Sequence, residues 1–248
     1  MSYNVSMPNI DIKRLRVSYF KRKEETNVID TLSTHFDNGT FNVILGYSGC
    51  GKSTLLRTLM GLMPYEGDIY VDGVDIKNIP IQERNFSFVS QEYVLYPNLT
   101  IFDNIAFPLK MRNTPRNEII KRVNEIAEKF NLTACLSRKP WQISGGQQQK
   151  VCIARALIKK PVLCLFDEPF SNLDQQSRSE AIYYLKTAIN ELGITVIYVT
   201  HSVSEATSLA DKIYIMNDKV IEAELDPDSF LESPNEVAQS LLKMEFNK

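Results

Sequence analysis

Apolar side chains early in the chain alternate with polar ones, a pattern typical of half-buried strands. The alternation covers Ile10–Val17 and Val28–Phe36. The second segment turns at residues 37–39 into a continuous apolar run, Phe41–Leu45. The pattern predicts three strands here, and we expect their pairing to be antiparallel.

Continuous apolar runs later in the chain are typical of parallel strands buried on both faces. They cover residues 162–166 and 194–199, and a helical pattern over 177–192 lies between them. The remaining predictions are strands over 67–73 and 85–89, a hairpin over 213–221, and short helical segments after Pro227 and Pro234.

Helical periodicity replaces the strand pattern between Tyr93 and about Trp141, for example over Asn117–Ala127. A further helix is predicted over Gln148–Ile158. The sequence therefore predicts one α/β domain, residues 1–248. We expect a helical subdomain over about 92–159 to be inserted between the two parts of a catalytic core, about 1–91 and 160–248.

Composition is ordinary for a globular protein, with 44% hydrophobic and 23% charged residues among 248. The formal net charge of −2 is unlike that of a nucleic-acid binder, so we expect no nucleic acid partner. No apolar stretch reaches the roughly 18 residues of a membrane span, and the first residues lack a secretory pattern. Four cysteines, at 50, 135, 152 and 164, show no C-x-x-C spacing. These features predict a soluble protein of the reducing cytoplasm, without a zinc site or disulfide framework.

A glycine-rich segment follows the predicted strand Phe41–Leu45 and opens into an apolar helical pattern, 55–60. It fits G-x-x-x-x-G-K-[ST], the pattern of a phosphate-binding loop. In such a loop, backbone N–H groups and the helix N-terminus surround phosphate oxygens, a lysine reaches the outer phosphates, and a hydroxyl is free to bind Mg²⁺. A glycine-rich turn without a ligand is the alternative. The predicted phosphate-binding residues are Gly46, Ser48, Gly49, Cys50, Gly51, Lys52, Ser53 and Thr54.

Two carboxylates, Asp167 and Glu168, end the apolar run 162–166. This position is the carboxyl edge of the sheet, beside the phosphate loop. Asp167 is suited to hold Mg²⁺ through water, and Glu168 to polarise or deprotonate the water that attacks a γ-phosphate. By itself, an Asp-Glu pair at a strand end is more often a solvated turn.

A second glycine pair, Gly145 and Gly146, precedes the predicted helix 148–158. Glycines at a helix start expose backbone N–H groups, which form a second anion site. One phosphate loop cannot use both anion sites on a single nucleotide.

With these motifs, the chain resembles an ATP-binding-cassette (ABC) ATPase over nearly its whole length. The run Ile143-Ser144-Gly145-Gly146-Gln147 is similar to the family signature LSGGQ, from which Ile143 departs mildly. The resemblance implies a P-loop NTPase (RecA-like) core with an antiparallel β subdomain and an inserted α-helical subdomain. It also implies that two subunits sandwich two ATP molecules. Each ATP would be bound by the phosphate loop of one subunit and by residues Ser144–Gln147 of the other.

The same resemblance implies roles for residues outside these motifs. Gln91 matches the Q-loop glutamine that senses Mg²⁺ and the attacking water, and so joins Ser53 and Asp167 as a predicted metal residue. Asp174 lies in residues 171–174, which match the D-loop, and His201 matches the switch histidine that contacts the γ-phosphate. Taken singly, Gln91 and His201 would be an ordinary surface residue and an ordinary strand-end histidine.

An aromatic residue that stacks on adenine is also implied. Tyr19 matches it, and the neighbouring Phe20 competes for the role. Without the resemblance, Tyr19 would be read as a core aromatic.

The chain has one cassette and no long coiled coil, and it retains Glu168 and His201. These features favour the ATP-binding subunit of a prokaryotic importer, at the cytoplasmic face of the membrane, with separate permease subunits and, indirectly, an extracytoplasmic solute-binding protein. Residues 95–110 and 167–174 resemble sugar-importer ATPases, so we expect a sugar as solute. Maltose-type subunits usually add a C-terminal regulatory domain, for which 248 residues leave no room. Nitrate, taurine or iron importers and a soluble ABC ATPase acting on a macromolecular assembly remain alternatives.

Two further expectations concern single side chains. Five apolar residues after Gln91 are expected either to line the groove that receives a permease helix or to form the core of the helical insert; they are Tyr93, Leu95, Tyr96, Leu99 and Phe102. Cys50 lies beside Lys52 at a helix start, a setting that lowers a thiol pKa. The alternative is that Cys50 is simply a small residue tolerated in the loop.

Overall fold

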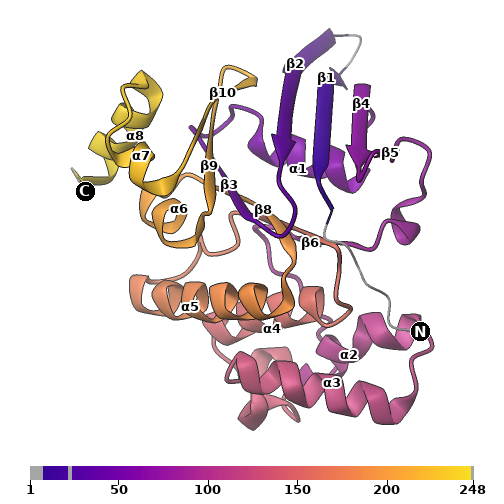
Figure 1. The fold of residues 1–248 in the computed structure, drawn as a ribbon. Coiled ribbons are helices and arrows are strands. Elements are labelled where there is room, and N and C mark those ends of the chain that lie inside the picture. The colour runs from indigo at the N-terminus through magenta and orange to yellow at the C-terminus, as the bar shows by residue number, and fades with distance from the viewer. Residues whose placement is uncertain (1–7, 22–23, 247–248) are drawn as a thin grey trace.

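A computed structural model describes residues 8–21 and 24–246 and contains two β-sheets with helices around them (Figure 1). The strands are β1 (Ile10–Lys21), β2 (Glu24–Phe36), β3 (Phe41–Leu45), β4 (Glu66–Val71), β5 (Val74–Asp75), β6 (Phe86–Val89), β7 (Leu163–Asp167), β8 (Thr195–Thr200), β9 (Lys212–Asn217) and β10 (Val220–Leu225). The α-helices are α1 (Lys52–Met60), α2 (Ile101–Met111), α3 (Arg116–Lys129), α4 (Gly145–Leu157), α5 (Gln175–Leu192), α6 (Val203–Leu209), α7 (Pro227–Leu231) and α8 (Glu236–Phe246). Short 3₁₀ turns are η1 (Ile81–Glu83), η2 (Thr133–Cys135) and η3 (Pro140–Gln142).

The two sheets differ in strand direction. An antiparallel sheet has the order β2-β1-β4-β5. The second sheet has the order β10-β9-β3-β8-β7-β6, in which every neighbouring pair is parallel except β10 with β9. The mixed α/β fold predicted from the sequence is confirmed.

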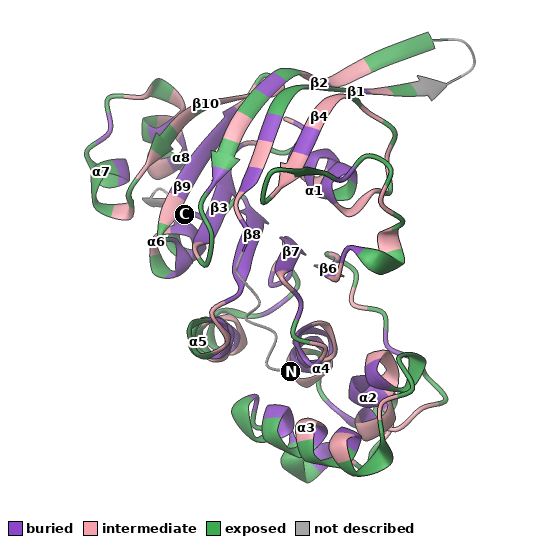
Figure 2. Ribbon diagram, turned by 45° about the vertical axis from the view of Figure 1, so that its right-hand side comes forward, coloured by how far each residue is buried: buried purple, intermediate pink, exposed green. Residues whose placement is uncertain are grey.

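Strands β3, β7 and β8 are buried throughout, as Figure 2 shows. Alternate side chains enter two different cores, because successive residues of a strand point to opposite faces. On β8, Val196 and Tyr198 join the core shared with the helices α2–α6, whereas Ile197 and Val199 join the core shared with α1 and the antiparallel sheet. Burial on both faces explains the continuous apolar runs in the sequence.

One pairing expectation was wrong. β1 and β2 are antiparallel, but β3 does not continue their sheet; it pairs with β8 and β9 in the parallel sheet. The physical reason is that all five residues of β3 are buried, so the strand needs cover on both faces.

Helix α4 begins at Gly145, three residues before the predicted start. A capping box accounts for the difference: Ser144 Oγ accepts from the Gln147 N–H, and the Gln147 side chain accepts from the Ser144 N–H. Both signature glycines therefore lie inside the first turn of the helix.

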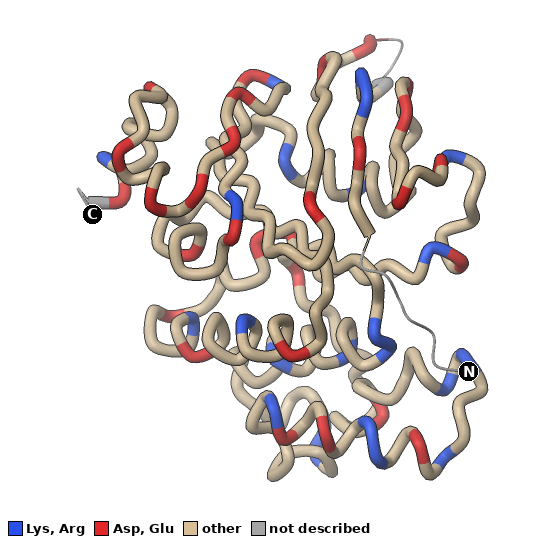
Figure 3. Tube along the Cα trace, viewed as in Figure 1, with Lys and Arg blue, Asp and Glu red and all other residues tan. Residues whose placement is uncertain are grey.

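Charges of both signs are interspersed along the chain, for example on α3 and α5 (Figure 3). In the described part of the chain, no helix is both long enough and apolar enough to cross a bilayer.

Candidate functional site

The phosphate loop runs from the end of β3 to the start of α1. Gly49 and Gly51 have φ values of +84° and +111°, which side chains other than glycine rarely adopt. Gly46 packs against β9, where an added Cβ would lie 2.2 Å from the Met216 carbonyl oxygen. The loop therefore requires these glycines for its backbone path, before any ligand is considered.

Lys52, the first residue of α1, is buried. Its ammonium donates to the carbonyl oxygens of Gly46 and Tyr47, at 2.8 Å each. These bonds keep the Lys52 ammonium, the only charged group of the loop, inside the loop. A phosphate oxygen can replace the carbonyl oxygens as its acceptor.

Ser53 and Asp167 meet across the site. The Ser53 hydroxyl donates to Asp167 Oδ1 at 2.7 Å, which joins the start of α1 to the end of β7. Burial raises the pKa of Asp167, although the Ser53 hydrogen bond and the charge of Arg57 oppose the shift. A buried carboxylate of this kind is stabilised in its charged form by a cation.

These oxygens fit a magnesium site. No group of three or more His, Cys, Asp and Glu in the described part of the chain could hold a metal. Mg²⁺ is commonly held by one or two carboxylates together with substrate phosphates and water, so Ser53 Oγ and Asp167 are an adequate protein share. Gln91, which is exposed, lines the same cavity.

Glu168 is held in an unusual backbone conformation. Its φ is +45°, in the left-handed region, and its N–H donates to the Val199 carbonyl of the neighbouring strand at 3.0 Å. Strained residues of this kind persist where the surrounding structure fixes them, often at functional sites. The conformation turns the side chain away from the strand and toward His201.

His201 follows β8, and its Nδ1 lies 3.1 Å from Glu168 Oε2. The hydrogen bond from His201 lowers the pKa of Glu168, and the same bond with the Glu168 charge raises the pKa of His201. Both shifts favour the ion pair, so Glu168 is a carboxylate able to accept a proton at neutral pH.

A cavity of about 300 Å³ is open above this loop. It unites predicted residues from three places in the sequence: Ser48, Gly49, Gly51, Lys52, Ser53, Thr54, Gln91 and Glu168 line it. Val28, which sequence reasoning missed, lines it too. Val28 lies on β2, where the alternation signals a strand but not a ligand contact.

Tyr19 lies beside this cavity, on β1. It is 37% exposed, and its hydroxyl lies 3.3 Å from the Thr54 hydroxyl. The alternative reading of Tyr19 as a core aromatic does not hold, because this part of β1 leaves the residue on the surface. The side chain of the competing residue, Phe20, lies outside the described part of the chain.

The second anion site is separate from the first. Among the residues that the structure describes, Ser144–Gln147 do not line the cavity. Gly146 instead packs against Ser177 of α5, whose N–H donates to Asp174 Oδ1 at 3.0 Å. The N-terminus of α4, with the signature glycines, and the N-terminus of α5, with Asp174, are thus neighbours. Both lie away from the phosphate loop of the same chain.

The expected reactivity of Cys50 is corrected. Burial raises the pKa of this thiol, and the opposing effect of Lys52, whose Nζ lies 3.9 Å away, is smaller. The Lys52 ammonium is directed at two carbonyl oxygens, and its effect on the thiol does not outweigh burial.

Comparison with known proteins fits this geometry. Residues 29–171, more than half of the chain, match the family described as ABC transporter. The chain belongs to the ABC transporter family. As an ABC protein it spans about half to three fifths of the length of the curated relatives that it matches.

Three of these relatives are import ATP-binding proteins. The trehalose/maltose protein MalK of Thermococcus litoralis is 42% identical over 88% of this chain and 60% of its own length. The molybdate/tungstate protein WtpC of Pyrococcus horikoshii is 49% identical over 72% of this chain and 52% of its own. The spermidine/putrescine protein PotA of Mannheimia succiniciproducens is 40% identical over 93% and 61%.

A solved structure gives the same architecture. The ATP-binding cassette MJ0796, as a dimer in a post-hydrolysis state bound to ADP and Pi, superposes with a TM-score of 0.78 at 31% identity. The match covers 88% of this chain and 98% of that one. The P-loop NTPase core predicted from the sequence is confirmed.

An exposed tryptophan lies close to the signature. Trp141 in η3 is 63% exposed, and the Lys139 ammonium lies 5.0 Å from the centre of its ring. Motif spacing gave no reason to single it out. It is the only tryptophan of the sequence.

Proposed function

We propose that this chain is the ATP-binding and ATP-hydrolysing subunit of an ABC importer. The observation that carries the proposal is that Glu168, paired with His201, lines the same cavity as the phosphate loop. Ser53, which is hydrogen-bonded to Asp167, lines that cavity too. Three import ATP-binding relatives favour an importer over a soluble ABC ATPase of another kind.

Each residue has a distinct part in the proposed reaction. Backbone N–H groups of the loop and the Lys52 ammonium bind the phosphates, and Tyr19 stacks on adenine. Glu168 accepts a proton from the attacking water, while His201 holds Glu168 in place and contacts the γ-phosphate. Gln91 positions the water. Ser53 and Asp167 would hold Mg²⁺, whose charge would neutralise phosphate charge.

A second subunit completes each site in this proposal. The signature residues lie apart from the cavity of their own chain, and the related cassette MJ0796 is a dimer. Ser144, Gly145, Gly146 and Gln147 of one copy would bind the ATP of the other, with Asp174 beside them. The subunit is then peripheral, at the cytoplasmic face of the membrane, with residues 92–159 as its helical subdomain.

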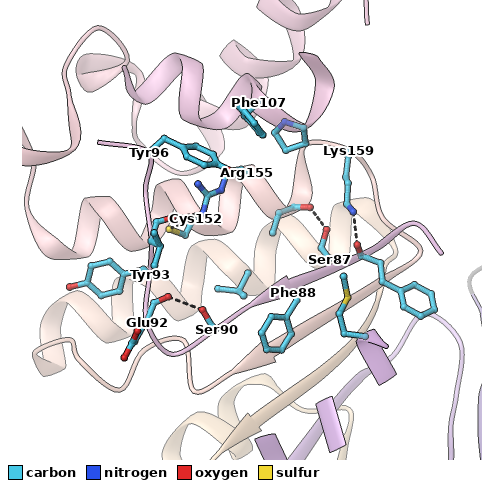
Figure 4. A pocket seen from close by; sticks show the side chains of 16 residues that line it. Ser87, Phe88, Ser90, Glu92, Tyr93, Tyr96, Phe107, Cys152, Arg155 and Lys159 are labelled. Carbon is cyan, nitrogen blue, oxygen red and sulfur yellow. Dashed lines mark hydrogen bonds between the residues drawn. The ribbon is translucent and has the colours of Figure 1, made fainter. Parts of the chain in front are cut away.

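A groove suited to a permease segment lies between the helical region and β6 (Figure 4). Its volume is about 330 Å³, and apolar rings line it: Phe88, Tyr93, Tyr96 and Phe107. Arg155 stands within it, 5.2 Å from the Tyr96 ring, and donates to the Val94 carbonyl. Lys159 and Glu92 also line the groove. Aromatic rings beside two cations and one carboxylate fit an amphipathic segment that carries acidic residues.

The five apolar residues expected here divide between the two alternatives. Tyr93 and Tyr96 line the groove, whereas Leu95 is buried and Phe102 packs against the larger core. Leu99 is half-buried and does not line the groove. Their side chains diverge because the segment from 93 to 99 is a loop rather than one helix face.

The solute is not fixed to a sugar. The relatives import trehalose or maltose, molybdate or tungstate, and spermidine or putrescine, at 40–49% identity to this chain. These solutes differ in charge and size, so the ATP-binding subunit carries little information about them. We propose a small solute of unspecified class.

Replacement of Glu168 by Gln tests the proposed function. The amide cannot accept a proton, so turnover should fall by about a thousandfold while ATP still binds. The variant should elute as an ATP-trapped dimer on gel filtration. Glu83→Gln, at an exposed position, is the control and should behave as the unmodified protein. Unchanged turnover in Glu168→Gln would contradict the role of Glu168.

A further inference from the structure

A buried carboxylate lies behind the switch histidine. Glu205 of α6 is only 3% exposed. Its Oε2 accepts from the Tyr198 hydroxyl at 2.7 Å and from the Thr200 hydroxyl at 2.8 Å, both on the strand that leads into His201. Burial raises the pKa of Tyr198 well above its usual value, so this phenol stays a donor. Glu205 therefore fixes the end of β8, the strand that directly precedes His201.

The second oxygen of this carboxylate faces α5. Glu205 Oε1 lies 3.7 Å from Arg178 Nε, which is beyond an ordinary hydrogen bond. Arg178 Nε is buried and has no hydrogen-bond partner among the described residues. An unpaired buried donor beside an unfilled acceptor means that a shift of under about 1 Å would close a charge-assisted hydrogen bond.

Arg178 also holds the segment that carries Asp174. Its guanidinium donates to the Leu173 carbonyl at 2.9 Å, and its N–H to the Asp174 carbonyl, also at 2.9 Å. One side chain therefore connects residues 171–174 with the carboxylate beneath His201. The Phe170–Asp174 turn and the β8–α6 turn, although distant in the sequence, are thus connected by the pair of buried Glu205 and half-buried Arg178.

We propose that Glu205 and Arg178 are positioning residues for ATP hydrolysis, which fix the position of His201 relative to the Leu173–Asp174 segment. The inference rests on the proposed function, because it assigns His201 to the reacting phosphate. Neither residue touches the cavity itself. The Arg178–Glu205 pair can be either hydrogen-bonded or separated. Displacement of residues 171–174 by a second subunit would change this pairing and so be transmitted to His201.

The Glu205→Gln variant separates this role from simple packing. Its amide oxygen can still accept from Tyr198 and Thr200, but its NH₂ group would then face Arg178 Nε–H, a donor against a donor. Only the connection to α5 is lost. Arg178→Met removes the same connection from the other side, at a half-buried position where folding is less at risk.

Steady-state ATP hydrolysis and binding of a fluorescent ATP analogue should be measured on the full chain. For both variants we expect kcat to fall at least about tenfold, because small misplacements of reacting groups are costly. The analogue's Kd should change less than about twofold. The double variant should be no worse than either single variant, since both break one connection. Arg178→Lys, which keeps the charge, should recover part of kcat.

Lys212→Met, which breaks an exposed ion pair with Glu224 and Asp226, is the matched control and should leave kcat unchanged. A lower melting temperature with unaltered kcat in Glu205→Gln and Arg178→Met would overturn the inference, as would additive losses in the double variant. If the unmodified chain hydrolyses ATP in a Glu168-dependent way, such results reject the positioning role alone. If it hydrolyses none, the proposed function fails and the inference fails with it.

Discussion

At the scale of single residues, the environment of Glu168 determines its chemistry. Its left-handed backbone directs the carboxylate at His201, and the resulting hydrogen bond lowers the pKa of Glu168. A lower pKa means a weaker base, but one that is fully ionised at neutral pH. We infer that the pairing with His201 keeps Glu168 deprotonated at neutral pH, whereas a carboxylate with a raised pKa would be a stronger base but partly protonated.

Titration of His201 provides a direct check of this pair. Its folded-state pKa is raised, so the stabilisation it contributes is complete below about pH 6.5, the unfolded value, and is lost as pH rises through the folded pKa. Glu168→Gln removes the main cause, and the pKa of His201 should move down toward 6.5. Proton NMR of the two histidines measures it.

His35 supplies the control for that titration. Hydrogen bonding to Asp11 raises its pKa independently, so its curve should not change in Glu168→Gln. His35→Gln identifies which signal belongs to which ring. An unmoved His201 titration would mean that Glu168 does not set its protonation.

Cys50 leads to a second prediction at this scale. Because burial raises its thiol pKa, maleimide should label it more slowly than a free thiol at pH 7, and MgATP should slow the labelling further. The other cysteines are buried, so Cys50→Ser should abolish most of the early labelling. Fast labelling that is insensitive to MgATP would contradict this account.

At the scale of elements, the backbone carbonyls at the end of α1 depend on one arginine. Arg84 is buried, and its guanidinium donates to the carbonyl oxygens of Leu59, Ile76 and Ile79. Burial lowers its pKa, and no carboxylate compensates its charge among the contacts that the structure describes. The side chain therefore serves as a cap that joins α1 to the segment before β6.

Arg84→Met should destabilise the fold by about 2 to 4 kcal/mol, because it leaves buried carbonyl groups without donors. Urea denaturation followed by circular dichroism measures the change. Arg116→Met, at an exposed position, should stay within about 0.5 kcal/mol of the unmodified protein. Equal stabilities of the two variants would show that the carbonyl contacts contribute little.

Long helices were predictable because their apolar spacing persists over many residues, as in α3 and α5. Helix α6 was not, since it has only seven residues and its local cap, in which Ser202 Oγ accepts from the Glu205 N–H, is supplemented from a distant element. Glu245 of α8 accepts from the N–H groups of Val203 and Ser204 and from the Ser202 hydroxyl. A cap 41 to 43 residues away leaves no local pattern in the sequence.

At the scale of the whole molecule, the motifs of the candidate site were predictable and their connections were not. Lys52, Ser53, Asp167, Glu168 and His201 belong to short patterns with a chemical reason for each residue type. Val28, Arg178 and Glu205 have no such pattern, because their positions follow from strand register and helix packing. The wrong sheet assignment of β3 has the same origin.

The exposed Trp141 gives this molecule an optical reporter of its own. Since the sequence has one tryptophan and that ring lies two residues before the signature, its emission follows events at this end of α4. Addition of MgATP to Glu168→Gln should shift the emission to shorter wavelength, with a dependence on protein concentration that a folding change within one chain would not show. A spectrum that is insensitive to concentration would mean that no second copy approaches this ring.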